Sequence, residues 1–157
     1  MEIDLNVFKK NYLVAGLGDE DVRRVSRLAE VEVAQPGEEI VKLGSREPDL
    51  FVILDGTAIV YREGGVVLAE RGPGAVIGEI ALVDDGPRSA YVHAKTTLAY
   101  AKFDGRALRR FMFEHKDVGF IMLSNVSRVL SATVRQASAT IEGLSVKLID
   151  PWEHALQ

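Results

Sequence analysis

The sequence predicts a mainly β fold, an antiparallel sandwich or barrel with helices before and after it. From residue 31 to residue 103, short apolar runs alternate with glycine and proline turns at intervals of roughly 8–12 residues, which is typical of such folds. Outside this region the apolar residues recur every three or four positions, as on one face of a helix. The 157 residues suffice to bury the core of one domain. We expect that domain to span residues 1–145 and a tail to occupy residues 146–157.

The first predicted helix spans residues 19–30, ahead of the strands. Asp19 is placed to cap it, and Glu20 and Asp21 favour the positive end of the helix dipole. Its apolar face comprises Val22, Val25, Leu28 and Ala29.

Two hairpins are predicted within the β region. The clearer one joins residues 50–54 to residues 57–61 through the Asp-Gly pair at 55–56, because Asp-Gly readily supplies the positive φ of a type I′ turn. The second turns at the Gly-Gly pair at 64–65 and leads into a strand at residues 66–70.

Two helices, covering about residues 104–142, are predicted after the strands. Asp104 can cap a short helix that runs through Phe113, and a longer helix spans about residues 117–141. This longer helix is too apolar on one side to stand alone in water, so we expect it to lie across the β domain or to pair with a second copy. Its apolar residues are Val118, Ile121, Met122, Val126, Val129, Leu130, Val134 and Ile141.

Composition excludes several classes of function. The net charge of −4 argues against binding nucleic acid through bulk charge, and the absence of cysteine excludes disulfides, thiolate metal sites and cysteine nucleophiles. The three histidines follow no metal-binding pattern, so we expect no metal and no cofactor. No signal peptide and no apolar stretch of the ~18 residues needed for a membrane span is visible. We therefore expect a cytoplasmic protein.

The segment GEIALVDDGPRSA, residues 78–90, carries groups suited to an anion. The helix that Glu79 opens is limited to one or two turns, and its first N–H groups, near Ile80 and Ala81, lack partners within the helix. Arg88 adds a planar fork that matches phosphate oxygens, and Ser89 adds a hydroxyl donor.

The carboxylate of Glu79 suits a group that lies beside the phosphate, not the phosphate itself. An ionised Glu79 only accepts hydrogen bonds, so it suits a donor such as a ribose hydroxyl. Together the acid, the amides, the arginine and the serine indicate a site for a sugar phosphate. The alternative is an ion pair between Glu79 and Arg88 that only closes the loop.

The longer segment GAVIGEIALVDDGPRSAYVHA resembles the phosphate-binding cassette of cyclic-nucleotide-binding domains, whose pattern is Gly-Glu-x-Ala-Leu, a short variable loop, then Arg-Ser/Thr-Ala. Upstream, GEEIVKLGSREPDLFVILDGTAIVY resembles the first strands of that family, and the likeness covers roughly residues 7–140. The resemblance implies an antiparallel β-roll (a double-stranded β-helix, jelly-roll-like) with an N-terminal helix and a long C-terminal helix. It also implies bound cyclic AMP or cyclic GMP, with cyclic AMP favoured.

Carried over position by position, the resemblance implies a role for each residue of the cassette. Glu79 would accept from the ribose 2′-hydroxyl, and Arg88 and the Ala81 N–H would hold the cyclic phosphate. Ser89 would bond a phosphate oxygen or the base edge, and Gly78 would leave room for the sugar. The predicted ligand-binding residues, including the small residue after the serine, are Gly78, Glu79, Ile80, Ala81, Arg88, Ser89, Ala90 and Thr133.

The last of these residues lies on the long C-terminal helix. The apolar register around Leu130 places Thr133 where the relatives cap the base, although a threonine can instead bond its own helix backbone.

We therefore expect a non-enzymatic sensor module that responds to a cyclic nucleotide and passes the signal to an effector protein or to a second copy in a homodimer. About sixteen residues follow Ile141, too few for a helix-turn-helix, so DNA binding is not expected. The alternative is a ligand-free β-roll scaffold for dimerisation or partner binding. A metal-free cupin-like enzyme is a third interpretation, and its only candidate base is Glu79.

Overall fold

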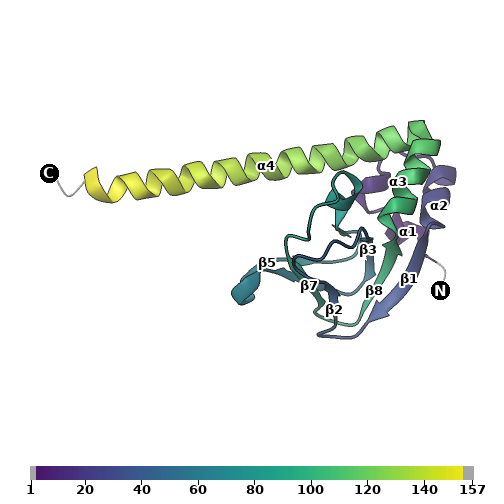
Figure 1. Cartoon of the computed structure of the whole chain (residues 1–157), viewed down its shortest axis with the longest axis horizontal. Coiled ribbons are helices and arrows are strands. Elements are labelled where there is room, and N and C mark those ends of the chain that lie inside the picture. The colour runs from purple at the N-terminus through teal and green to yellow at the C-terminus, as the bar shows by residue number, and fades with distance from the viewer. Residues whose placement is uncertain (1–2, 154–157) are drawn as a thin grey trace.

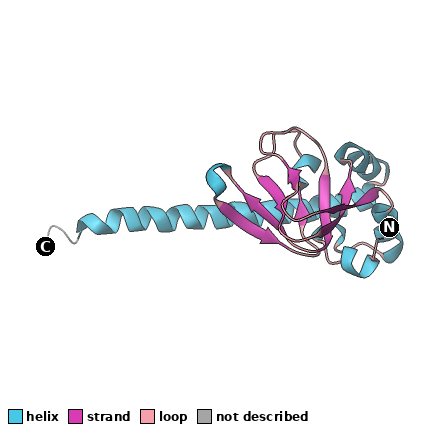
Figure 2. Ribbon diagram, turned by 90° about the horizontal axis from the view of Figure 1, so that it is seen from below, coloured by secondary structure: helices cyan, strands magenta, loops and turns pink. Residues whose placement is uncertain are grey.

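The computed structural model describes residues 3–153, with side chains described for residues 3–144. Two four-stranded antiparallel sheets form the centre of the molecule, with short helices at one end and one long helix running past them (Figures 1 and 2). This arrangement confirms the antiparallel β-roll with an N-terminal helix and a long C-terminal helix that the sequence predicts.

Three short helices precede the strands, where the sequence predicts a single helix at residues 19–30. They are α1 (Leu5–Phe8), the 3₁₀ helix η1 (Tyr12–Val14) and α2 (Asp19–Ser26). Gly18, not Asp19, is the N-cap of α2, and the carboxylate of Asp19 instead accepts from Lys9 Nζ at 2.7 Å. The predicted helix at 19–30 is wrong beyond Ser26, because Ala29 already pairs with Phe103 in the first strand.

The two sheets each contain four strands. The order in the first sheet is β1 (Ala29–Ala34), β8 (Leu98–Phe103), β3 (Leu50–Asp55) and β6 (Val76–Ile77). In the second sheet it is β2 (Glu39–Val41), β7 (Tyr91–Ala94), β4 (Ala58–Tyr61) and β5 (Val67–Arg71). The mutual packing of the sheets buries their inward-facing side chains completely at several positions, among them Ile53, Ala58 and Leu98.

The clearer of the two predicted hairpins is wrong. Strands β3 and β4 belong to different sheets and do not pair, so the Asp-Gly pair between them carries the chain from one sheet to the other. A type I′ turn requires positive φ at both central residues. Gly56 has φ +84°, but no non-glycine residue in the described chain has positive φ, Asp55 included. The Thr57 N–H instead donates to Thr96 Oγ1 at 3.0 Å, which fixes the crossing.

The second predicted hairpin is confirmed. Strand β4 pairs with β5 from Ala58 opposite Arg71 to Tyr61 opposite Val67. The connection is the short 3₁₀ segment η2 (Glu63–Gly65), in which Gly64 has φ +80°.

Two helices follow the sheets. In α3 (Gly105–Glu114), the carboxylate of Asp104 accepts from the N–H groups of Arg106 and Ala107, as the predicted cap requires. The long helix α4 (Lys116–Glu153) extends past both ends of the predicted helix, and it continues beyond residue 146, where the tail is predicted to begin. Residues 154–157 lie outside the described residues.

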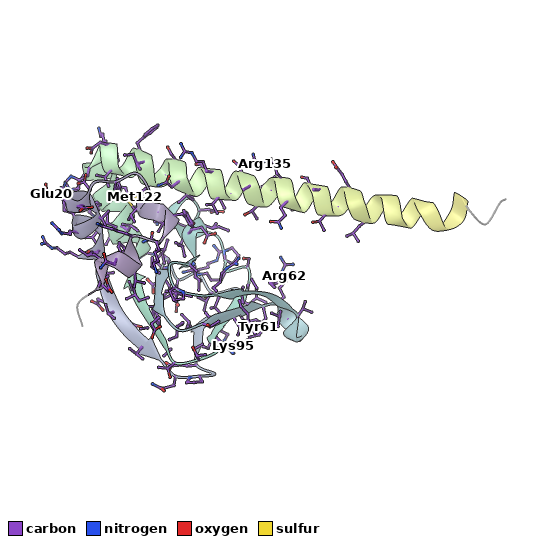
Figure 3. All side chains as sticks on the ribbon, turned by 180° about the vertical axis from the view of Figure 1, so that it is seen from behind. Glu20, Tyr61, Arg62, Lys95, Met122 and Arg135 are labelled. Atoms are coloured by element: carbon purple, nitrogen blue, oxygen red, sulfur yellow. The ribbon has the colours of Figure 1, made fainter. Side chains whose placement is uncertain are left out.

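The two halves of α4 have different surroundings. In the first half, Val118, Met122 and Val126 are buried against the N-terminal helices, and Asn125 Nδ2 donates to the carbonyls of Leu13 and Ala15. From residue 131 to residue 144 every residue is exposed. Figure 3 shows the contrast between Met122, beside the N-terminal helices, and Arg135, further along the helix. No helix in residues 3–153 is long and apolar enough to cross a membrane.

The attachment of α4 to the body of the domain can be tested at Met122. This side chain is fully buried, so we expect Met122→Ala to lower the free energy of unfolding by about 2–5 kcal/mol. Phe113→Ala on the preceding helix α3 is the control, since Phe113 is 75% exposed and its truncation should cost far less. Urea denaturation measures both values. Equal losses would contradict the observed packing.

Candidate functional site

All eight predicted ligand-binding residues line one cavity of about 390 Å³. One wall consists of the cassette, which includes Gly78, the short 3₁₀ helix η3 (Glu79–Leu82) and the segment 88–90. Strands β4, β5 and β7 form the other wall, and Thr133 reaches the cavity from α4. The structure thus brings together residues that are separated by 55 positions in the sequence. The remaining lining is mostly apolar, with Val41, Val60, Val76, Ile77 and Val92 among its members.

Gly78 gives the cassette its shape. Its φ of +84° is in the left-handed region, which favours glycine, and this turn directs the chain from β6 into η3. A Cβ atom at this position would lie 2.5 Å from Arg88 Nη1 and 2.9 Å from the Asp49 carbonyl oxygen. In this structure Gly78 therefore leaves room for the guanidinium, in addition to any role beside a sugar.

The half-buried guanidinium of Arg88 is held by backbone carbonyls. Its Nη2 donates to the Asp49 carbonyl and its Nη1 is 3.5 Å from the Gly78 carbonyl oxygen. Its backbone N–H donates to the Ser45 carbonyl at 2.8 Å, and its carbonyl accepts from the Gly44 N–H at 2.9 Å. The side chain and the backbone of Arg88 are thus both fixed.

The charge of Arg88 is compensated only in part. Burial lowers the pKa of its guanidinium, while the negative charges of Asp49, Glu47 and Glu79 act in the opposite direction. Even a lowered arginine pKa leaves the group cationic at neutral pH. A partly buried cation that meets carbonyls rather than a carboxylate is suited to receive an anion.

Glu79 and Arg88 do not form the loop-closing ion pair that the sequence leaves open. Within the described residues, the ion pairs do not include one between these two side chains. Glu79 lies close enough to Tyr12 for its charge to raise the pKa of that phenol, after the larger effect of burial. The Tyr12 hydroxyl is itself buried without a hydrogen-bond partner among the described residues. The acid and the arginine are therefore separate groups on one wall.

The backbone of η3 differs from the sequence expectation in one respect. The Ala81 N–H, expected to face a phosphate, donates to the Gly78 carbonyl at 3.0 Å. The side chain of Ala81 is buried, whereas that of Ile80 is 45% exposed at the mouth of the cavity.

The remaining predicted residues lie nearer to the sheet and the long helix. Ser89 and Ala90 lead from Arg88 into β7. Thr133 Oγ1 donates to the Val129 carbonyl at 3.0 Å, so the threonine bonds its own helix and lines the cavity at the same time. Its hydroxyl proton is engaged, and its oxygen lone pairs remain able to accept.

Besides the apolar lining, sequence reasoning missed two polar contributions to the site. Asp49 contributes its carbonyl to Arg88, and Arg71 from β5 lines the cavity. The first contact is made by a backbone atom and leaves no side-chain signal. Alternation along β5 could have revealed the second, because Ala69 and Arg71 face the same side of the strand. No cluster of three or more metal-ligating side chains occurs in the described part of the chain.

The fold and the cavity define a β-roll domain with a cavity of about 390 Å³ between the cassette and the strands. The family model described as cyclic nucleotide-binding domain matches residues 31–115, more than half of the chain. The chain therefore belongs to the cyclic nucleotide-binding domain family, as the cassette motif led us to expect.

Individual relatives agree with this assignment. The cAMP-dependent protein kinase regulatory subunit of Yarrowia lipolytica is 28% identical over 151 residues, which cover 90% of this chain and 38% of that protein. The N-terminal domain of a transcriptional regulator from Streptomyces coelicolor is 26% identical, with a TM-score of 0.73, and 83% of this chain matches 93% of that one. The catabolite activator protein of Thermus thermophilus shares the fold, with a TM-score of 0.77 at 24% identity over 86% of this chain and 63% of that one. The chain spans 21–38% of the length of the curated relatives compared with it.

The contact between Gly78 and Arg88 predicts the effect of one added methyl group. We expect Gly78→Ala to lower the free energy of unfolding by more than the roughly 1–2 kcal/mol that a left-handed alanine costs, because the Cβ would also collide with the guanidinium. Gly64→Ala is the matched control, with φ +80° and nothing within 4 Å of the added Cβ. Urea denaturation gives the free energy of unfolding of both variants, and the difference between their losses measures the cost of the collision. A loss at Gly78 no larger than at Gly64 would contradict it.

Proposed function

We propose that this protein binds a cyclic mononucleotide in the cavity and acts as a ligand-responsive regulatory module. The observation that carries the proposal is the separation of Glu79 from Arg88 on one wall of a cavity of about 390 Å³. That volume falls within the range of roughly 300–1,000 Å³ that is usual for small-molecule sites. The family assignment supports the same conclusion.

The chemistry of the cassette fits a sugar phosphate. Arg88 uses two of its N–H donors on the carbonyls of Asp49 and Gly78, and a guanidinium has five, so donors remain for phosphate oxygens. Glu79, which accepts only, is suited to the ribose 2′-hydroxyl. Nothing in this mode of binding calls for a metal or another cofactor, and we propose no reaction on the nucleotide.

The hydrogen bond that Thr133 donates to its own helix favours adenine at the end of the cavity where the base would lie. Because its hydroxyl proton is donated to Val129, the side chain can offer only an acceptor to the ligand. The exocyclic N6 amino group of adenine is a donor, whereas O6 of guanine is an acceptor. This geometry supports the expected preference for cyclic AMP over cyclic GMP, as does the name of the Yarrowia relative.

The exposed half of α4 is the element that we propose transmits the signal. Phe120, Ser127 and Val134 are spaced by seven residues, and so are Leu123, Leu130, Ala137 and Leu144. These positions, the seam, have the spacing of the a and d positions of a coiled coil. Val134 is 64% exposed and Leu144 is 55% exposed, so the seam has apolar surface to bury. We infer a homodimer through α4, in which ligand contact at Thr133 shifts the population of helix positions that a second copy or an effector protein contacts.

Isothermal titration calorimetry with cyclic AMP tests the binding site. We expect Arg88→Ala to weaken binding by about 100-fold or more, since at least one charge-assisted hydrogen bond pair to phosphate is lost. Arg62→Ala is the control, because this exposed arginine on the β4–β5 hairpin does not line the cavity (Figure 3). Binding that survives the loss of Arg88 would overturn the cassette assignment. No heat with either cyclic nucleotide would instead favour the ligand-free scaffold.

The dimer can be tested independently of the ligand. We expect the chain to sediment as a dimer at tens of micromolar and Val134→Glu to convert it to a monomer, because a charge at the seam is desolvated on pairing. Gln136→Glu introduces the same charge off the seam and should leave the dimer intact. Sedimentation velocity distinguishes the two states. A dimer unaffected by Val134→Glu would place the interface elsewhere.

A further inference from the structure

A second cavity lies between the N-terminal helices and β1, the edge strand of the first sheet. Its volume is about 300 Å³, and none of its described lining residues lines the cavity of the cassette. Figure 1 shows β1 at the outer edge of the domain, next to α2. The apolar part of the lining comes from the N-terminal segment and from β1, and it consists of Ile3, Leu5, Ala29 and Val31. No part of the proposed function uses this cavity.

Two arginines of this second cavity have no ion-pair partner among residues 3–144. Arg23 in α2 and Arg27 at its C-cap are four residues apart, so both lie on the same face of the helix. Both side chains are exposed, and neither takes part in an ion pair between described residues. Asp19, the acid four residues before Arg23, is bound to Lys9. Two like charges at this spacing repel each other, so the pair is suited to bind carboxylates.

Strand β1 has an open edge beside this second cavity. It is first in the order β1-β8-β3-β6 and pairs with β8 alone. In an antiparallel ladder, every second residue directs its N–H and C=O groups away from the partner strand. Apart from the pairing with β8, no backbone hydrogen bond among the described residues reaches residues 29–34. An extended peptide can therefore add to β1 as a further strand.

The two faces of β1 differ in chemistry. Side chains alternate along a strand, so Val31 and Val33 lie on the face of the helices, where Val31 lines the cavity and Val33 is 46% exposed. Glu30 and Glu32 lie on the other face, where Glu32 accepts from the Tyr100 hydroxyl at 2.8 Å. A second copy of β1 paired antiparallel would bring glutamates next to glutamates and would offer no acid to the two arginines. The arginines and the glutamates together fit a strand that is acidic on one face and basic on the other.

We propose that β1 is a docking edge for an extended segment of a partner protein. On the helix side of this segment, acidic side chains bind Arg23 and Arg27, and an aliphatic side chain between them enters the cavity. On the other side, basic side chains face Glu30. Main-chain hydrogen bonds to β1 align the segment, and the side chains at alternate positions give specificity. This docking edge is separate from the nucleotide cavity and does not depend on it.

The peptide acetyl-Thr-Glu-Lys-Val-Lys-Glu-Thr-amide has this pattern and tests the docking edge. Its binding to the isotope-labelled chain is followed by NMR without any nucleotide. We expect amide hydrogen exchange to slow at alternate residues of 29–34. The dissociation constant should rise about tenfold in the double variant Arg23→Gln and Arg27→Gln, because charge-assisted hydrogen bonds are lost. Arg62→Gln is the control, since this exposed arginine lines neither cavity and its loss should leave the constant unchanged.

Two N-methylated forms of the peptide test the main-chain pairing. One form carries methyl groups on the amides of its odd residues, and the other carries them on the amides of its even residues. Only one of the two forms directs its methyl groups toward β1, because alternate amides of a strand point to opposite sides. We expect that form alone to lose binding.

Three results would overturn the docking edge. They are unchanged hydrogen exchange in β1 at millimolar peptide, equal affinity for the two N-methylated forms, and equal affinity of the wild-type chain and the double arginine variant. Slowed exchange in β1 with hexanoate alone, as strong as with the peptide, would assign the cavity to a small carboxylate and overturn strand addition. None of these measurements uses a cyclic nucleotide, so their failure would leave the proposed function untouched.

Discussion

The half-buried guanidinium of Arg88 is the constraint on which the cassette depends. It joins three segments that are distant in sequence: the carbonyl of Asp49 before β3, the carbonyl of Gly78 before η3, and its own loop before β7. Asp49 is in turn fixed through its carboxylate, which lies 3.5 Å from Lys102 Nζ on β8. Burying a cation is costly unless its donors are satisfied. The carbonyls of Asp49 and Gly78 accept from only some of the N–H donors of Arg88. The guanidinium that holds the loops together therefore still has donors for an anion.

The two halves of α4 differ in how far the domain buries them. The first half is part of the core, since Met122 and Val126 are completely buried and Asn125 satisfies two carbonyls of the N-terminal segment. In the second half, residues 131–144 are all exposed, and Thr133 lines the cavity. A helix that is anchored at one end and in contact with a ligand pocket in its middle can occupy more than one position at small cost in packing. Under the proposed function, a bound ligand would need only to favour one of those positions.

Local sequence signals predicted the local features well. The glycine before Glu79, the turn after Leu82 and the cap at Asp104 each act within a few residues, and the structure has η3 and α3 where those signals place them. The pairing of β3 with β8 rather than β4 could not be read from the Asp-Gly pair, because the burial of both strands between the sheets decides it. The same limit applies to the site. The cassette side chains were predictable from the motif, whereas the contact of the Asp49 carbonyl with Arg88 and the place of Arg71 in the cavity lining depend on how distant strands pair.

His115 separates α3 from α4 with a non-helical backbone (φ −115°, ψ 76°), and α4 then runs from Lys116 to Glu153 without a further break, which has a mechanical consequence. At 1.5 Å per residue, the 38 residues of α4 form a rigid rod of about 57 Å. Because Met122 and Val126 are held in the core, only the exposed part of the helix can tilt, and residues 131–153 span about 35 Å of that rod. A tilt of about 10° in this part displaces its far end by about 6 Å. Sub-ångström adjustments near the β-roll are thereby amplified by leverage alone, with no need for the domain itself to deform.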